Sequence, residues 1–299
     1  MKIMRIISIS LLLFILLPQT VGSLGKKALP QGMKLHFIDV GQGDSTLIET
    51  PENKIILIDG GPPGAGKKVL AYLEKQQIYK IDLVIATHPD VDHIGGLIPV
   101  LQKVPVKQVV DSGKLHSTKT YRNYLKYIRK HNIPFEIAER HGYIQLDPKL
   151  AIQVLNTYDK DKKDNNEASI VLRIRFRQVV FLLMADAKIE QEQEIMKQSI
   201  VEADILKIGH HGSNTSSSRA FIEAVQPQVA LLTYSRENNF GHPVERVIRN
   251  LQRIQAQIYS TATFGNIVIW TNGEHYFVLP SKNPLDYLHH RETFYRNTS

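Results

Sequence analysis

Hydrophobic and polar residues alternate along much of this chain with the period of two that is typical of β-strands, and runs with apolar residues three and four apart stand between them. Strands are predicted at residues 35–40, 45–50, 54–59, 83–86, 169–176, 179–186, 205–208, 229–234, 257–260, 266–270 and 276–279, with further short ones within 135–154. Helices are predicted at residues 67–77, 95–103, 117–132, 187–198, 219–225 and 244–255. Hairpins followed by strand, helix and strand predict an α/β sandwich.

The second half of this pattern repeats the first. In each half a hairpin leads to an apolar strand that ends in an acidic residue, Asp59 in the first half and Asp186 in the second. A carboxylate at the end of a buried strand is costly unless a cation or hydrogen bonds meet it. Both positions are therefore candidates for a functional site, although either aspartate could instead cap the turn or helix that follows it.

The amino-terminal segment has the layout of a secretory signal peptide. Lys2 and Arg5 precede an apolar run over residues 6–17, and small residues follow at Gly22 and Ser23. This run is shorter than the roughly 18 apolar residues that a membrane anchor needs. We therefore predict a secreted protein without stable membrane insertion, whose oligomeric state stays open. The predicted parts are a signal peptide over residues 1–23, a linker over 24–33, one folded domain over 34–280 and a basic tail over 281–299.

Composition limits the chemistry that the chain can perform. The 299 residues include 37 Lys and Arg against 29 Asp and Glu, and this net charge of +8 favours polyanionic partners. Cysteine is absent, which excludes disulfides and a cysteine nucleophile. No Gly-x-Ser-x-Gly segment occurs, and Lys67 is followed by Lys68 rather than by Ser or Thr. Neither a serine-hydrolase elbow nor a nucleotide-binding P-loop is therefore indicated.

The densest group of chemically active residues directly follows the predicted strand at 83–86. His88, Asp90, Asp92 and His93 lie within six residues of one another. Imidazole and carboxylate groups together suit zinc or manganese, and a cation would offset the repulsion between the acids. The alternative is a polar turn between strand and helix that Asp92 caps, but such a turn would need neither histidine.

Three segments together resemble one protein family. The pattern His-x-Asp-x-Asp-His at residues 88–93 resembles the first metal motif of the metallo-β-lactamase fold, with Asp90 where the common form has His. Together with LHFIDVGQGDS at residues 35–45 and LKIGHHGS at 206–213, it is similar to the hydrolase domain of the ComEC/Rec2 DNA-uptake channel proteins. The resemblance covers roughly residues 34–279 and implies a four-layer αββα sandwich.

The resemblance also implies roles for individual residues. It implies a site for two divalent ions, Zn²⁺ or Mn²⁺, in which Asp186 bridges the metals, Asp59 orients the ligands, and Asp92 both ligates and steers an attacking hydroxide. Adjacent histidines on a glycine-flanked loop can point in different directions, so we expect His210 to ligate and His211 to act on the substrate or a proton. The alternative is an exposed loop pair. The expected metal ligands are His88, Asp90, Asp92, His93, Asp186 and His210.

The usual fold has a third histidine ligand that this chain lacks, because no histidine occurs between residues 142 and 186. One metal is therefore expected to bind weakly, to use water as a ligand or to be absent. His242, in a Gly-His-Pro segment, is expected to act at the mouth of the site, the alternative being a structural loop histidine. The polar residues expected to contact substrate are Asn166 and Ser169, at the place of the missing histidine, and Ser213 and Asn214, which offer a hydroxyl and an amide to a phosphate.

The predicted helix at residues 117–132 carries a ridge of positive charge. Its basic residues recur at spacings of three or four on one face, while its apolar residues lie on another. Such a ridge suits a phosphate backbone, and it is equally typical of a solvated helix face. The basic residues of the ridge are Lys119, Arg122, Lys126 and Arg129.

Together these features favour a secreted, metal-dependent hydrolase of phosphodiester bonds in DNA or another phosphate-bearing polymer, with a metal-activated hydroxide as nucleophile. Two alternatives stay open. The first is a metallo-hydrolase of another phosphoester, an ester, a lactone or a β-lactam, for which a histidine at position 90 would be expected. The second is a non-catalytic module that binds nucleic acid or a cell-surface polymer, which the missing third histidine favours.

Overall fold

The structure is a computed structural model that describes residues 32–161 and 163–284. The predicted signal peptide, residues 24–31 of the predicted linker and residues 285–299 of the predicted tail lie outside the described residues. Within the described residues, no helix has the length and apolar character needed to cross a bilayer.

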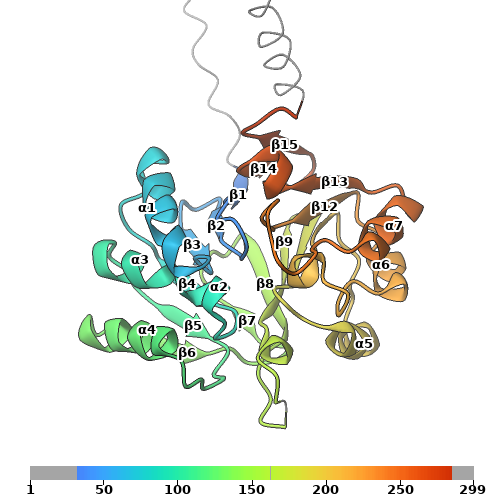
Figure 1. The fold of residues 1–299 in the computed structure, drawn as a ribbon. Helices are drawn as coiled ribbons and strands as arrows, with labels where there is room; N and C mark the ends of the chain where they lie inside the picture. The colour runs from blue at the N-terminus through green and yellow to red at the C-terminus, as the bar shows by residue number, and fades with distance from the viewer. Residues whose placement is uncertain (1–31, 162, 285–299) are drawn as a thin grey trace, which may run out of the picture. The chain divides into compact units, whose positions relative to one another are not determined.

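The first of two sheets has eight strands and is built mainly by the first half of the chain (Figure 1). Its strands are antiparallel from β15 to β3 and parallel from β3 to β6. In sheet order they are β15 (Tyr276–Pro280), β14 (Ile267–Thr271), β1 (Met33–Phe37), β2 (Thr46–Glu49), β3 (Ile55–Ile58), β4 (Leu83–Ala86), β5 (Val109–Asp111) and β6 (Phe135–Ile137).

The second sheet has seven strands and belongs to the second half of the chain. Its strands β7 to β10 are antiparallel, and β10 to β13 are parallel. In sheet order they are β13 (Gln257–Ser260), β12 (Val229–Leu232), β11 (Ile205–Lys207), β10 (Val179–Leu183), β9 (Val171–Phe176), β8 (Leu150–Asn156) and β7 (Tyr143–Ile144).

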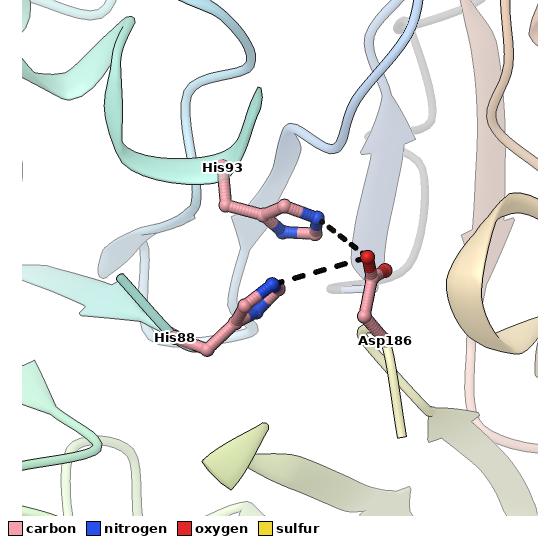
Figure 2. Close-up of side chains that lie close together, drawn as sticks. All are labelled: His88, His93 and Asp186. Carbon is pink, nitrogen blue, oxygen red and sulfur yellow. Dashed lines mark ion pairs between the residues drawn. The ribbon is translucent and has the colours of Figure 1, made fainter. Parts of the chain in front are cut away.

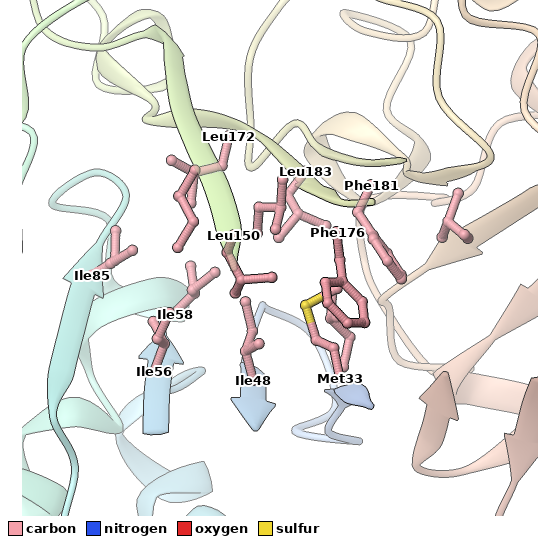
Figure 3. Packing of buried hydrophobic residues seen from close by; sticks show 14 of the residues in the cluster. Met33, Ile48, Ile56, Ile58, Ile85, Leu150, Leu172, Phe176, Phe181 and Leu183 are labelled. Carbon is pink, nitrogen blue, oxygen red and sulfur yellow. The ribbon is translucent and has the colours of Figure 1, made fainter. Parts of the chain in front are cut away.

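Three hydrophobic layers hold the sheets and helices together. In β3, Ile56 and Ile58 face the core between the sheets, whereas Leu57 faces the helices, as a period of two requires. Figure 3 shows the core between the sheets, where Ile56 and Ile58 meet Leu172 and Leu183 of the second sheet. The helices whose apolar faces cover the first sheet are α1 (Gly66–Lys75), α2 (Val91–Ile94), α3 (Leu97–Lys103) and α4 (Lys119–Lys130); those on the second are α5 (Ile189–Gln198), α6 (Arg219–Val225) and α7 (Glu245–Arg253).

This order of helices, sheet, sheet and helices confirms the predicted four-layer αββα sandwich. A short helix α8 (Thr261–Phe264) and the 3-10 helices η1 (Pro63–Ala65), η2 (Asn166–Ala168) and η3 (Gly209–Gly212) complete the described elements. The helix predicted at residues 95–103 is present as α3, which begins two residues later than expected. The short helix α2 before it and the three-residue strand β5 were not predicted.

The break between α2 and α3 has a backbone cause. The amide of Gly96 donates a hydrogen bond to the carbonyl of Gly61 over 2.8 Å, and Gly60 donates to the carbonyl of His93 over 2.7 Å. The loop after β3 therefore lies directly against the start of α3. A Cβ atom on Gly96 would stand 1.8 Å from the carbonyl oxygen of Gly60, so only glycine permits this approach.

We expect Gly96→Ala to lower the free energy of unfolding by about 3 kcal/mol, because two backbone segments would have to separate around the added methyl group. Gly64→Ala is the matched control, since a Cβ atom there has nothing within 4 Å. Its effect should stay within about 0.5 kcal/mol. Urea unfolding followed by circular dichroism measures both variants, and equal stability would contradict the expected clash.

Candidate metal centre

The candidate site lies where strands of both sheets end. His88 directly follows β4, and His93 is in the short helix α2 that comes next. Asp186 follows β10, and the 3-10 helix η3 with His210 and His211 follows β11. These segments come from opposite halves of the chain, and the sandwich brings their side chains to one place.

The carboxylate of Asp186 is at the centre of this group (Figure 2). Asp186 is buried, and so are His88, His93 and His211 around it. The distances from Asp186 Oδ2 to the Nε2 atoms are 3.3 Å for His93, 3.6 Å for His211, 3.7 Å for His210 and 3.9 Å for His88. One carboxylate oxygen thus faces four imidazoles.

Several of these atoms lack any hydrogen-bond partner among the described residues. They are Nε2 of His88, His93 and His211, and Oδ1 of Asp186. Buried polar atoms are normally satisfied, and four orphaned atoms in one place call for an explanation. The donor set fits a divalent cation, since neutral imidazole and carboxylate are its usual protein ligands.

The described residues contain four groups of three possible metal ligands, and three of these groups include His93. His88, His93 and Asp186 make one group, and Asp92, His93 and His211 make another, with all ligand atoms of a group within 4.8 Å of one another. Asp90 lies at the edge of the first group, with its Oδ2 3.6 Å from His88 Nε2. Because one histidine nitrogen coordinates one ion, His93 can serve only one of these two groups at a time, and the binding of two ions stays a prediction.

Hydrogen bonds on the far side of each ring orient the imidazoles. His93 Nδ1 lies 2.8 Å from Asp59 Oδ2, and His211 Nδ1 lies 2.7 Å from the carbonyl of Thr233. Asp59 also accepts hydrogen bonds from the amide and hydroxyl of Thr87, at 2.9 and 2.6 Å. These contacts leave Nε2 of each ring pointing into the site. Asp59 thus lies where a residue that orients the ligands is expected.

Charge within the site shifts the pKa values of its members. Burial raises the pKa of Asp186, but His211 and His93 outweigh it and hold this pKa well below its ordinary value. Burial likewise raises the pKa of Asp92, which His211 and His93 nevertheless bring to about 2. Burial lowers the pKa of His93, yet Asp186 and Asp59 raise it well above its usual range. An ion that binds here would therefore have to displace the proton of His93, whereas the carboxylates of Asp186 and Asp92 are already ionised.

The adjacent histidines have different surroundings. Both have positive φ angles, 48° for His210 and 55° for His211, which is why neighbouring side chains can reach the same site. His211 is buried, and its Nε2 lies 3.5 Å from Asp92 Oδ2. The His210 side chain is 22% exposed, and its Nδ1 lies 2.9 Å from the hydroxyl of Thr215. His211 belongs to a group of three possible ligands and His210 does not, although both rings lie at similar distances from Asp186. The predicted roles, His210 as ligand and His211 at the substrate or a proton, stay predictions.

The loop before β9 contacts the central aspartate and its neighbours. Ser169 accepts a hydrogen bond from the amide of Asp186 over 3.2 Å, so it holds the central aspartate in place. Asn166 has its Nδ2 3.5 Å from His210 Nε2, and its buried Oδ1 lacks a partner among the described residues. Asn165, which the sequence did not single out, donates to Asp90 Oδ1 over 2.7 Å. Contact of Asn166 and Ser169 with a substrate stays a prediction.

The loop after η3 is fixed from outside the site. Arg246 donates to the side chain of Asn214 over 3.0 Å and to the carbonyl of Ser216 over 2.6 Å. The hydroxyl of Ser213 lies 3.1 Å from that of Thr215. Ser213 and Asn214 therefore shape the loop that carries the histidines, and their contact with substrate stays a prediction.

His242 lies beside the paired histidines. Its ring centroid is 5.7 Å from that of His210 and 6.4 Å from that of His211, and its buried Nδ1 has no partner among the described residues. Burial lowers the pKa of His242, and His210 and His211 lower it further. Its predicted catalytic role is not tested by this geometry, but the ring is close enough to face a bound substrate.

Sequence reasoning missed a buried ion pair beneath the site. Lys207 Nζ lies 2.5 Å from Asp44 Oδ2, and both residues are buried. The hydroxyl of Thr233 donates to Asp44 Oδ1, which is also 3.4 Å from His211 Nδ1. A lysine inside the apolar strand 205–208 was the available signal, because a buried charge requires a partner.

The predicted basic ridge lies on α4. Its residues Lys119, Arg122, Lys126 and Arg129 are exposed. Three of them, Arg122, Lys126 and Arg129, line a separate groove of about 860 Å³. Contact of this ridge with a phosphate backbone stays a prediction.

Residues 38–235 match the Metallo-beta-lactamase superfamily. The chain therefore belongs to this superfamily, whose members are generally metal-dependent hydrolases. Relatives include the ComE operon protein 3 of Bacillus subtilis, which is 31% identical over 252 residues that cover 78% of this chain and 32% of that protein. The Recombination protein 2 of Haemophilus influenzae is 28% identical over 239 residues, 78% of this chain and 28% of that protein. These relatives confirm the resemblance to the ComEC/Rec2 hydrolase domain.

The Competence protein ComA of Neisseria gonorrhoeae is 26% identical over 211 residues, 70% of this chain and 28% of that protein. The chain thus spans about a third or less of the length of these curated relatives. Among solved structures, the metallo-beta-lactamase fold protein YhfI of Bacillus subtilis has a TM-score of 0.54 and 13% identity, over 83% of this chain and 100% of that one. The diiron β-hydroxylase CmlA of Streptomyces venezuelae has a TM-score of 0.52 and 13% identity, over 77% of this chain and 53% of that one. Both structures share the fold.

Proposed function

We propose that the chain is an exported, metal-dependent phosphodiesterase that acts on nucleic acid. The observation that carries this proposal is the cluster of buried Nε2 atoms of His88, His93 and His211, which lie 3.9, 3.3 and 3.6 Å from Asp186 Oδ2 and have no hydrogen-bond partner among the described residues. Such atoms are costly to bury unless a ligand meets them.

Six residues of the chain are the proposed metal ligands. His88, His93, Asp186 and His211, with Asp90 and Asp92, would hold the divalent ions. A bound divalent ion lowers the pKa of coordinated water towards neutrality and stabilises negative charge that develops on a phosphoryl oxygen.

Asp92 is placed to orient the attacking water, because its side chain is 36% exposed at the edge of the group and its pKa of about 2 keeps it ionised as a hydrogen-bond acceptor. His242 has a lowered pKa and is therefore neutral near pH 7. One of its ring nitrogens can then donate a hydrogen bond to the substrate.

Three features support a phosphodiester rather than a β-lactam. Asp90 replaces a histidine of the common motif, the net charge is +8, and two of the relatives are named for competence and recombination. A cationic protein attracts polyanions. Support for export comes from the sequence of residues 1–23 alone.

The test uses the 299-residue chain, stripped of metal by a chelator and then supplied with Mn²⁺ or Zn²⁺. We expect it to hydrolyse bis-p-nitrophenyl phosphate and DNA only with metal, and to leave the β-lactam nitrocefin intact. Single-stranded and double-stranded DNA are compared for preference. Turnover of nitrocefin with inert DNA, or tight DNA binding without hydrolysis of either diester, would refute the proposed activity.

A further inference from the structure

An open cavity of about 790 Å³ lies beside the candidate metal centre. One wall comes from the loop between β5 and α4, and the other from the loop between β8 and β9. Asp90, at the edge of the metal centre, is part of its lining. The remaining lining residues are Lys114, Leu115, His116, Ser117, Lys163, Asp164 and Asn165.

The sheet order explains why this cavity adjoins the metal centre. β5 pairs in parallel with β4, so the loops after these two strands leave the same edge of the sheet. The loop after β4 carries His88 and Asp90, and the loop after β5 forms the wall of the cavity. A hydrogen bond of 3.4 Å from the hydroxyl of Thr157 to the carbonyl of Ser112 joins the two loops at their base.

The polar groups of the cavity are suited to an anion. Lys114 and Lys163 supply positive charge, and His116 and Ser117 supply hydrogen-bond donors. Of the two acids in the lining, Asp164 is paired with Lys188, and Asp90 lies at the metal-centre end of the cavity, where its Oδ1 accepts a hydrogen bond from Asn165. The side chain of Leu115 is 78% exposed and offers apolar surface at the rim.

We propose that this cavity binds a backbone phosphate next to the scissile bond, so that the substrate is a polynucleotide rather than an isolated phosphodiester. The inference rests on the proposed phosphodiesterase function and states where the strand lies. The strand passes Asp90 and continues between the two loops, with a flanking phosphate between Lys114 and Lys163 and a base against Leu115. Cations that contact phosphates contribute affinity that falls as salt rises.

The experiment compares two diesters in the full chain loaded with metal. Bis-p-nitrophenyl phosphate has no flanking phosphate, whereas a 12-nucleotide single strand of DNA has several. The variant Lys114→Ala/Lys163→Ala should raise KM for the oligonucleotide about 10-fold, and lower the slope of log affinity against log salt by about 1.4 for two contacts. Its kcat/KM for bis-p-nitrophenyl phosphate should stay within about two-fold of the wild type.

Two controls sharpen the result. Lys114 also lies over the ring of Tyr158 at 4.8 Å, so Lys163→Ala is measured alone to separate loop packing from charge. It should raise KM for the oligonucleotide about 3-fold, since one of two contacts is lost. The exposed pair Lys68→Ala/Lys197→Ala removes the same charge from α1 and α5 and should leave both substrates unaffected.

Unchanged oligonucleotide kinetics in the cavity variants, or equal losses with both diesters, would overturn the inference. Failure of the wild type to cleave either diester would instead refute the proposed activity. In that case the binding of a fluorescein-labelled 12-mer decides the matter by anisotropy: about 10-fold weaker binding by the double variant supports a strand site, and equal binding rejects it.

Discussion

Replacing Asp186 by asparagine is expected to lower kcat/KM for a phosphodiester by about 1,000-fold or more and to release metal from the protein. Asp186 Oδ2 faces His93, His211 and His88 at 3.3, 3.6 and 3.9 Å, so its charge is the one that the imidazoles share. Asparagine has nearly the same volume but no charge. Metal content by elemental analysis and kinetics with bis-p-nitrophenyl phosphate measure the effect.

The chain offers a matched control for this substitution. Asp82 is also buried, but it accepts hydrogen bonds from Lys107 and from the amide of Ile55, outside the ligand groups. Asp82→Asn should keep its metal and its activity while losing some stability. If Asp186→Asn retained both metal and turnover, Asp186 would not be a ligand, and the proposed activity would lose its central residue.

Replacing Lys207 by methionine is expected to lower the free energy of unfolding by about 3–5 kcal/mol in the metal-free protein. The substitution leaves the carboxylate of Asp44 buried without its cation, since Lys207 Nζ lies 2.5 Å from Asp44 Oδ2. Removing both charges should cost much less, because no unpaired ion is left. The double variant Asp44→Asn/Lys207→Met should therefore recover stability to within about 2 kcal/mol of the wild type.

Urea unfolding in the presence of a chelator measures this effect without a contribution from bound ions. Lys107→Met is the matched control, because Lys107 pairs with Asp82 but is itself 59% exposed. Loss of this pair should cost no more than about 1 kcal/mol. If Lys207→Met and Lys107→Met lowered the free energy of unfolding equally, or if the double variant did not regain stability, burial would not explain the contribution of the Asp44–Lys207 pair.

Much of the fold could be predicted from the sequence, because local patterns determine most of it. Alternating residues such as Ile56, Leu57 and Ile58 indicate which side of a strand faces each layer, and the structure agrees. The strand β5 escaped prediction because three residues are too few to show a period. The break between α2 and α3 escaped because it depends on Gly60, which is distant in the sequence from Gly96.

Some residues of the candidate site could likewise be predicted from the sequence, and others could not. Candidate ligands such as His88 and Asp186 could be named because ionisable groups just after apolar strands are easily recognised in the sequence. The choice between His210 and His211 depends on backbone angles that neighbouring residues do not reveal. The pairing of Asp44 with Lys207 and the cavity beside Asp90 arise only when the two halves of the chain meet.

The candidate ligands follow strands of both sheets, so an ion bound by them would cross-link the two halves of the sandwich. Binding of the ion would raise the free energy of unfolding of the domain. The increase is about 4 kcal/mol when the free metal concentration is 1,000 times the dissociation constant. At low metal concentration the protein would lose its activity and would also unfold more often. Proteases cleave unfolded chains, so its lifetime would become shorter.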